Sequence, residues 1–141
     1  MSLQLLLLLN FAFATYLTGV IWTVQLVHYP AFALVPPQAF DAYHKAHMAR
    51  MGWVVMVPMV AELLLAGALV LVGRTLGSVV WWSLALVVLI WAVTFFISVP
   101  FHNRLKASGF NYITIDGLTR TNWFRTLAWT ARMLLLLSVI S

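Results

Sequence analysis

Four apolar stretches, each long enough to cross a lipid bilayer, limit what this chain can fold into. An α-helix rises about 1.5 Å per residue, so roughly 20 apolar residues cross a hydrocarbon core of about 30 Å. We predict membrane-spanning helices over about residues 3–28, 48–72, 79–101 and 119–140. The 141 residues are 64% hydrophobic and 8% charged, whereas about 25% of the residues in a soluble domain are charged. This composition excludes an ordinary soluble enzyme and predicts one all-α domain over residues 1–141, an integral membrane four-helix bundle.

We expect the helices to be interrupted in the connections between the predicted spans. No charged side chain occurs between Met1 and Phe40, and no basic segment precedes the first span, so we expect a retained helix and not a removed signal peptide. Because proline lacks the donor that a helix interior needs, we expect breaks at residues 28–30 and 36–37. Residues 103–118 form the one substantial loop that we expect. The chain has no cysteine, which excludes disulfides and thiolate metal sites.

The basic residues are shared unevenly between the two ends of the predicted bundle. Lys and Arg in short loops favour the cytoplasm. We therefore expect a multi-pass protein of the bacterial inner membrane with both termini on the same, periplasmic side. In so apolar a chain we interpret the net charge of +5 as setting the orientation of the protein in the membrane and not as a nucleic-acid binding surface. We therefore expect no nucleic-acid partner. The residues at the cytoplasmic end are Lys45, Arg50, Arg104, Lys106 and Arg120, and the loop residue at the other end is Arg74.

Every histidine falls at the same predicted end of the bundle. His44 and His47 lie one turn apart, while His28 and His102 lie at the ends of two other spans, so we expect four imidazoles to converge. Imidazole nitrogens bind Zn, Cu and Fe, which makes all four residues candidate ligands of a single metal ion or one haem. Two alternatives stay open. In the first alternative, the histidines form hydrogen bonds with helix-end carbonyls and lipid headgroups. In the second, they transfer protons without a metal.

Two charged residues are expected to meet at mid-bilayer. Glu62 lies about 21 Å along its helix from Met48, and Arg132 lies about 18 Å from Arg120, measured from the same membrane face. An unpaired charge at this depth costs about 2.5–3.5 kcal/mol. We therefore predict a Glu62–Arg132 pair that either fixes the helix register or anchors a substrate and carries a proton.

Arg125 has no acid left to pair with. It lies one to two turns inside the predicted interface, and the remaining acids are loop residues. Arg125 either reaches out to a lipid phosphate or faces inward, where it would attract a carboxylate, a phenolate or a haem propionate.

Motifs along nearly the whole chain resemble a group of small, uncharacterised bacterial four-helix membrane proteins. More distantly, the chain is similar to the anthrone-oxygenase-like family. That resemblance implies a four-helix bundle and oxidation of a phenolic or enolisable molecule by oxygen. Asn122 and Trp129 lie with Arg125 and Arg132 on one polar stripe of the fourth predicted span, and we expect them to bind the cofactor. The chain departs from that family's pattern where His102 replaces an asparagine and Trp129 replaces a histidine. The motifs are His28-Tyr29-Pro30, Tyr43-His44-x-x-His47, Val99-Pro100-x-His102-x-x-Leu105 and Thr121-Asn122-Trp123-x-Arg125-Thr126-x-x-Trp129-x-x-Arg132.

Together these patterns predict a His-lined polar pocket at the cytoplasmic end of the bundle. We expect an oxidoreductase that acts on a lipophilic phenolic or quinone-like molecule entering between helices. Arg125 would neutralise a developing oxyanion, and the Glu62–Arg132 pair would form the pocket floor. The alternative is a non-catalytic accessory subunit of a larger photosynthetic or respiratory membrane complex. Partner membrane subunits or a homo-oligomer are compatible with either function.

Overall fold

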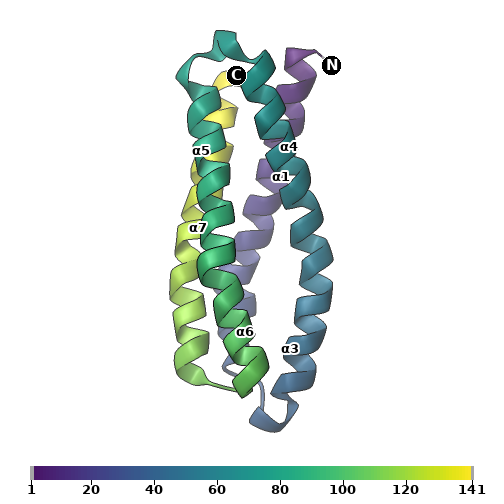
Figure 1. Ribbon diagram of the computed structural model, residues 1–141, viewed down its shortest axis with the longest axis vertical. Coiled ribbons are helices and arrows are strands. Elements are labelled where there is room, and N and C mark those ends of the chain that lie inside the picture. The colour runs from purple at the N-terminus through teal and green to yellow at the C-terminus, as the bar shows by residue number, and fades with distance from the viewer. Residues whose placement is uncertain (1, 141) are drawn as a thin grey trace.

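The computed structural model describes residues 2–140, and every regular element in that range is a helix (Figure 1). In chain order the elements are α1 (Leu3–Thr23), η1 (Val24–His28), α2 (Tyr29–Phe32), α3 (Pro37–Met51), η2 (Gly52–Met56), α4 (Val57–Val72), η3 (Arg74–Leu76), α5 (Ser78–Val93), η4 (Thr94–Ser98), α6 (Val99–Ser108) and α7 (Tyr112–Ile140). The prediction of an all-helical fold is confirmed.

These elements join into four long helices that run side by side (Figure 1). We call them the first to fourth helix, over Leu3–Phe32, Pro37–Val72, Ser78–Ser108 and Tyr112–Ile140. Each is long and apolar enough to cross a membrane, and each extends beyond the span predicted for it. The N and C ends of the chain lie at the same end of the bundle.

A π-helical turn interrupts each of the first three helices just before a proline. The π turns η1, η2 and η4 are each followed by one residue and then by Pro30, Pro58 or Pro100. Proline cannot donate to the carbonyl four residues earlier, and its ring clashes with that carbonyl, so a wider turn relieves the clash without ending the helix. The carbonyl that Pro58 leaves free, on Val54, accepts a hydrogen bond from the Tyr16 hydroxyl at 3.2 Å.

Two of the expected interruptions are therefore wrong, and one is confirmed. The first helix does not break at Pro30 but continues through a π turn to Phe32. The long loop expected over 103–118 is also wrong, because α6 runs on to Ser108 and α7 already begins at Tyr112. Gly109 makes this tight connection with a φ of 72°, a value that glycine adopts without strain. The break at residues 36–37 is confirmed, since α3 begins at Pro37.

The fourth helix is the central element of the bundle. It packs along both α1 and α5. The second helix packs differently along its length, since α4 lies against α1 and α5, whereas α3 meets α6 at fewer places. The bundle is consequently looser at the end where α3 and α6 lie.

A buried ion pair joins the second and fourth helices in the tightly packed half. The Arg132 Nη1 donates to Glu62 Oε1 at 2.7 Å, and both side chains are fully buried. Trp129 Nε1 donates to the other carboxylate oxygen at 3.0 Å. Arg132 Nη2 donates to Asn10 Oδ1 at 2.7 Å, and the Asn10 amide donates to the Leu65 carbonyl at 3.1 Å. The predicted pair is thus confirmed, as part of a network that ties three helices together.

A double-mutant cycle tests the contribution of this pair. Changing Glu62→Gln or Arg132→Gln alone leaves a buried charge unpaired, and we expect each to lower the free energy of unfolding by about 3–5 kcal/mol, with a smaller loss in the double variant than the sum. Thermal unfolding in detergent measures these losses. The control is Asp116→Asn with Arg120→Gln, an exposed pair for which we expect a coupling of about 0.5 kcal/mol or less. Additive losses at the buried pair would contradict a register role.

Candidate functional site

The four imidazoles converge between the first, second and third helices, as predicted. Ring centroids are 4.6 Å apart for His28 and His47, 5.3 Å for His44 and His102, and 5.5 Å for His47 and His102. Phe32 is fully buried against this cluster, with its ring edge-on to His47 at 4.9 Å. It lies in the helical turn after Pro30, so the uninterrupted first helix is what brings Phe32 and His28 to one place.

The imidazole nitrogens bond one another and a tyrosine. His28 Nε2 contacts His47 Nδ1, and His44 Nε2 lies 3.1 Å from His102 Nδ1. His102 Nε2 lies 3.1 Å from the Tyr29 hydroxyl. Within residues 2–140, no group of three or more His, Asp or Glu side chains is arranged to hold a metal ion. The four predicted ligands therefore come together, and the structure shows hydrogen-bonding contacts between their nitrogens.

The contacts of His102 form a hydrogen-bonded chain whose donors and acceptors exchange roles when the tautomer changes. A neutral imidazole has one donor nitrogen and one acceptor nitrogen. When His102 Nε2 accepts from the Tyr29 hydroxyl, its Nδ1 donates to His44. When His102 takes the other tautomer, it accepts from His44 and donates to the Tyr29 oxygen, which frees the tyrosine hydrogen for another acceptor.

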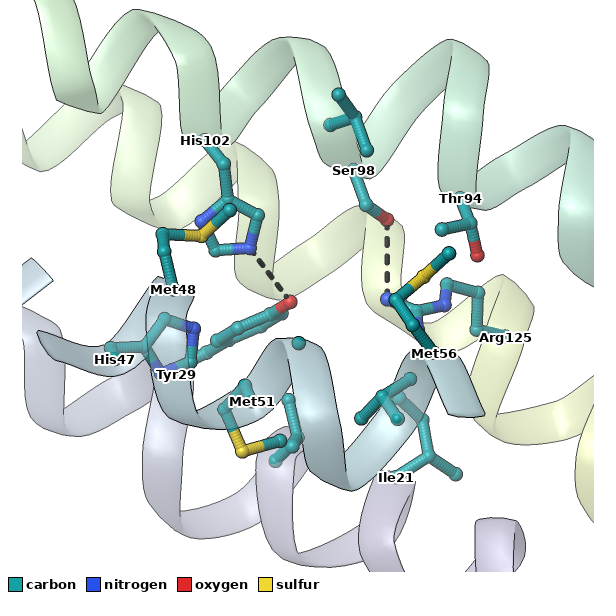
Figure 2. Close-up of a pocket in the computed structure, with 14 residues that line it drawn as sticks. Ile21, Tyr29, His47, Met48, Met51, Met56, Thr94, Ser98, His102 and Arg125 are labelled. Atoms are coloured by element: carbon teal, nitrogen blue, oxygen red, sulfur yellow. Dashed lines mark hydrogen bonds between the residues drawn. The ribbon is translucent and has the colours of Figure 1, made fainter. Parts of the chain in front are cut away.

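Beside this chain lies a cavity of about 110 Å³ (Figure 2). All three π turns contribute to its wall, as do Tyr29, His102 and Arg125. π turns are rare and occur frequently at functional sites. In this bundle they change which side chains face inward, because each wide turn holds more residues than an α-helical turn. The residues that line the cavity are Ile21, Val24, Tyr29, His47, Met48, Met51, Gly52, Val55, Met56, Thr94, Ser98, Val99, His102 and Arg125.

Arg125 faces inward and lines this cavity, which decides between the two orientations expected for it. Its side chain is 5% exposed. The guanidinium donates to Ser98 Oγ and to Asn122 Oδ1, both at 3.4 Å, which is long for a hydrogen bond from a charged donor. Its buried Nε has no hydrogen-bond partner. Figure 2 shows the Arg125 guanidinium and the Tyr29 hydroxyl pointing toward each other, and the two groups interact directly.

No carboxylate neutralises this guanidinium. The chain has three acidic residues. Glu62 is held in the buried pair, Asp116 is bonded four residues along its own helix, and Asp41 is exposed. Arg125 is therefore a buried cation whose anionic partner the described part of the protein does not supply.

The other predicted site residues hold Arg125 in place and do not line the cavity. Asn122 donates to Gln25 Oε1 at 3.0 Å, which fixes its own oxygen toward Arg125. The Trp129 ring lies 5.2 Å from the Arg125 guanidinium carbon, in a cation–π contact, and its indole nitrogen is bonded to Glu62. The prediction that Glu62 and Arg132 form the pocket floor is wrong, because neither of them lines the cavity.

A second hollow reaches the histidines from the end of the bundle. It measures about 550 Å³ and contains both His44 and His102. His102 thus lines the cavity on one side and this end hollow on the other. The residues that line the end hollow are Asp41, His44, Lys45, Met48, His102, Asn103, Leu105 and Lys106.

Sequence reasoning did not assign a role to Tyr29 or to Asn10. Tyr29 appeared only as part of a motif. Its neighbour Pro30 predicts a helix end, so the sequence does not indicate that Tyr29 lies within a continuous helix. Asn10 carried a signal that could have found it, since it is the one amide in the apolar run between Gln4 and Thr15. An amide buried in such a run needs a partner, here Arg132.

No family model matches this chain, and neither does any curated protein or solved structure.

The missing counter-ion of Arg125 leads to a prediction about stability. We expect Arg125→Met to raise the free energy of unfolding of the ligand-free protein by roughly 1–3 kcal/mol, because the change removes an incompletely bonded buried charge and keeps the volume. Arg132→Met is the matched control and should destabilise, since it leaves Glu62 unpaired. Thermal unfolding in detergent checks both, and destabilisation by Arg125→Met would show that the guanidinium is already satisfied.

Proposed function

We propose that this chain is a multi-pass protein of the bacterial inner membrane that binds a lipophilic phenolic or quinone-like molecule and acts on it as an oxidoreductase. The observation that carries the proposal is that a buried, uncompensated Arg125 lines one cavity with Tyr29 and His102, from which hydrogen bonds continue to His44. This wall offers a positive charge for an oxygen anion and a chain of neutral groups for the proton that the oxygen loses.

The chemistry begins with ionisation of the bound ligand. A phenol or quinol oxygen placed between Tyr29 and Arg125 loses its proton through Tyr29 to His102, and His102 passes a proton on to His44. The end hollow at His44 then exchanges that proton with water. Arg125 stabilises the oxygen anion that remains, in surroundings from which water is largely excluded.

Ionisation prepares the ligand for oxidation. A phenolate gives up electrons more readily than a phenol, and dioxygen is the oxidant that we propose, in keeping with the resemblance to anthrone-oxygenase-like proteins. A quinol that loses two electrons and two protons leaves as the quinone, and dioxygen takes up both electrons and both protons to leave as hydrogen peroxide. Glu62 and Arg132 support this site from a distance, because Glu62 holds Trp129, on which Arg125 lies. Asn122 and Trp129 act as positioning residues for Arg125.

An alkyl-substituted para-nitrophenol tests the proposal, because its phenolate absorbs visible light and its neutral form does not. We expect the wild-type protein to bind the probe as phenolate at a pH below the pKa of the free phenol. Arg125→Met should remove this absorbance, whereas Arg120→Met, at an exposed position, should leave it unchanged. A bound probe that stays neutral in the wild-type protein would contradict the proposal.

Metal removal distinguishes this mechanism from one in which the histidines hold a metal ion or a haem. Because the imidazoles bond one another and no metal group is formed in residues 2–140, we expect exhaustive dialysis against a chelator to leave the phenolate absorbance unchanged. Loss of the signal on chelation, with recovery on adding iron, copper or zinc, would instead favour a metal site at His28, His44, His47 and His102.

An accessory-subunit role is the second candidate, and the outer surface of the bundle favours it. Large aromatic side chains are widely exposed there, among them Trp53, Trp81, Trp82 and Phe96 at 62–81%. Such side chains could pack against the helices of partner membrane subunits or of a second copy of this chain. Purification in mild detergent with a stoichiometric membrane partner would support that role.

A further inference from the structure

The cavity opens sideways, between the second and third helices. Of the residues that line it, those contributed by the first and fourth helices are buried, among them Ile21, Tyr29 and Arg125. The partly exposed lining residues all belong to the second and third helices: Met48, Met51, Gly52, Val55, Met56 and Val99. We call these six residues the mouth. It lies in the looser half of the bundle, where α3 and α6 approach each other at few places.

The mouth lies where the polar end of the bundle gives way to its apolar part. On the second helix it surrounds Arg50, after which no charged residue occurs until Glu62. Trp53, next to Gly52 in the chain, is 77% exposed, and Phe96, in the facing π turn, is 81% exposed. Tryptophan is enriched at the boundary between headgroups and hydrocarbon. In a bilayer, the mouth would therefore open at the level where the head of a lipid-like molecule lies.

The size of the cavity limits the head of the ligand. An apolar cavity of about 150 Å³ binds benzene, and the volume here is about 110 Å³. This space can hold about one ring at most, so a fused polycyclic ligand would extend well beyond it. The rest of a larger ligand must leave through the mouth, whose side chains are apolar and include three flexible methionines, Met48, Met51 and Met56.

The polar residues of the cavity wall determine which chemical group of the ligand can bind there. The Arg125 guanidinium and the Tyr29 hydroxyl favour an acidic oxygen. The Tyr29–His102–His44 chain offers a route for a proton, which a ring hydroxyl needs in order to ionise, whereas a carboxylic acid in water has already lost its proton.

We infer that the ligand is a single-ring phenol or quinol with a long hydrocarbon tail, which enters from the bilayer through the mouth and leaves its tail there. This inference rests on the proposed function and narrows its substrate class, since it excludes the polycyclic phenols that the family resemblance implies. The ring oxygen lies against Tyr29 and Arg125, and the tail passes between η2 and η4.

Gly52 offers a way to close the mouth without disturbing the fold. A Cβ atom built on Gly52 meets no other atom within 4 Å, so the position tolerates a side chain that would project into open space. The same holds for Gly67, which lies on the same helix but away from the cavity. Gly52→Phe is therefore a blocking variant and Gly67→Phe its matched control. Val99→Phe blocks the mouth from the third helix and serves as a second, independent variant.

Binding is measured with the full-length protein in lipid nanodiscs by quenching of tryptophan fluorescence. The probes are dodecyl-substituted para-nitrophenol, para-nitrophenol without a tail, a three-ring hydroxyanthraquinone and dodecanoic acid. We expect the tailed single-ring phenol to bind at least about tenfold more tightly than each of the others. Gly52→Phe and Val99→Phe should each weaken its binding by about tenfold or more, while Gly67→Phe leaves it unchanged. Thermal unfolding confirms that the compared variants are folded.

The outcomes separate this inference from the function on which it rests. Equal or tighter binding of the hydroxyanthraquinone or of dodecanoic acid would overturn the single-ring phenol. Unchanged binding in folded Gly52→Phe and Val99→Phe proteins would overturn the sideways entry. If the tailed phenol binds through the mouth but remains neutral, the proposed function fails while the ligand class and its route stand.

Discussion

A charge buried in an apolar bundle requires a partner, and this requirement organises the structure of the protein. Glu62 satisfies Arg132 at 2.7 Å, and this pair fixes the second helix against the fourth. Trp129 links this pair to Arg125, because its indole nitrogen donates to Glu62 and its ring contacts the Arg125 guanidinium. Arg125 is the end of this series and has no carboxylate partner within residues 2–140. This buried guanidinium without a counter-ion is the feature on which the proposed binding of an external anion rests.

The prolines explain why that guanidinium faces a cavity and not a packed core. Each of Pro30, Pro58 and Pro100 follows a π turn, and all three π turns line the same space. Regular α-helices in these places would retain the tight packing seen between α4 and α5. The wider turns instead open the bundle near the histidines. The helix-breaking residues thus create the site and leave the four-helix architecture intact.

Much of this architecture could be predicted from the sequence. The length of the apolar stretches sets the number of long helices, and the small number of acidic residues limits which charged side chains can pair. The convergence of the histidines follows from their common end of the bundle, and the Glu62–Arg132 pair follows from equal depth and from the small number of acids. The continuation of the first helix past Pro30 and of the third helix to Ser108 could not be predicted. Proline and polar residues favour a break in the sequence pattern whether the helix ends there or continues through a π turn. The cavity depends on side-chain packing around these turns, which no residue pattern encodes directly. Tyr29 was hidden for the same reason.

Native mass spectrometry of protein released directly from its own membranes tests the central claim, that Arg125 holds an acidic oxygen of a membrane-derived molecule. We expect the wild-type protein to retain one small acidic compound with a hydrocarbon tail, which is lost on collisional activation and is absent from Arg125→Met. Wild-type and Arg125→Met proteins that carry the same adducts, or none, would show that the buried guanidinium is a feature of the fold alone.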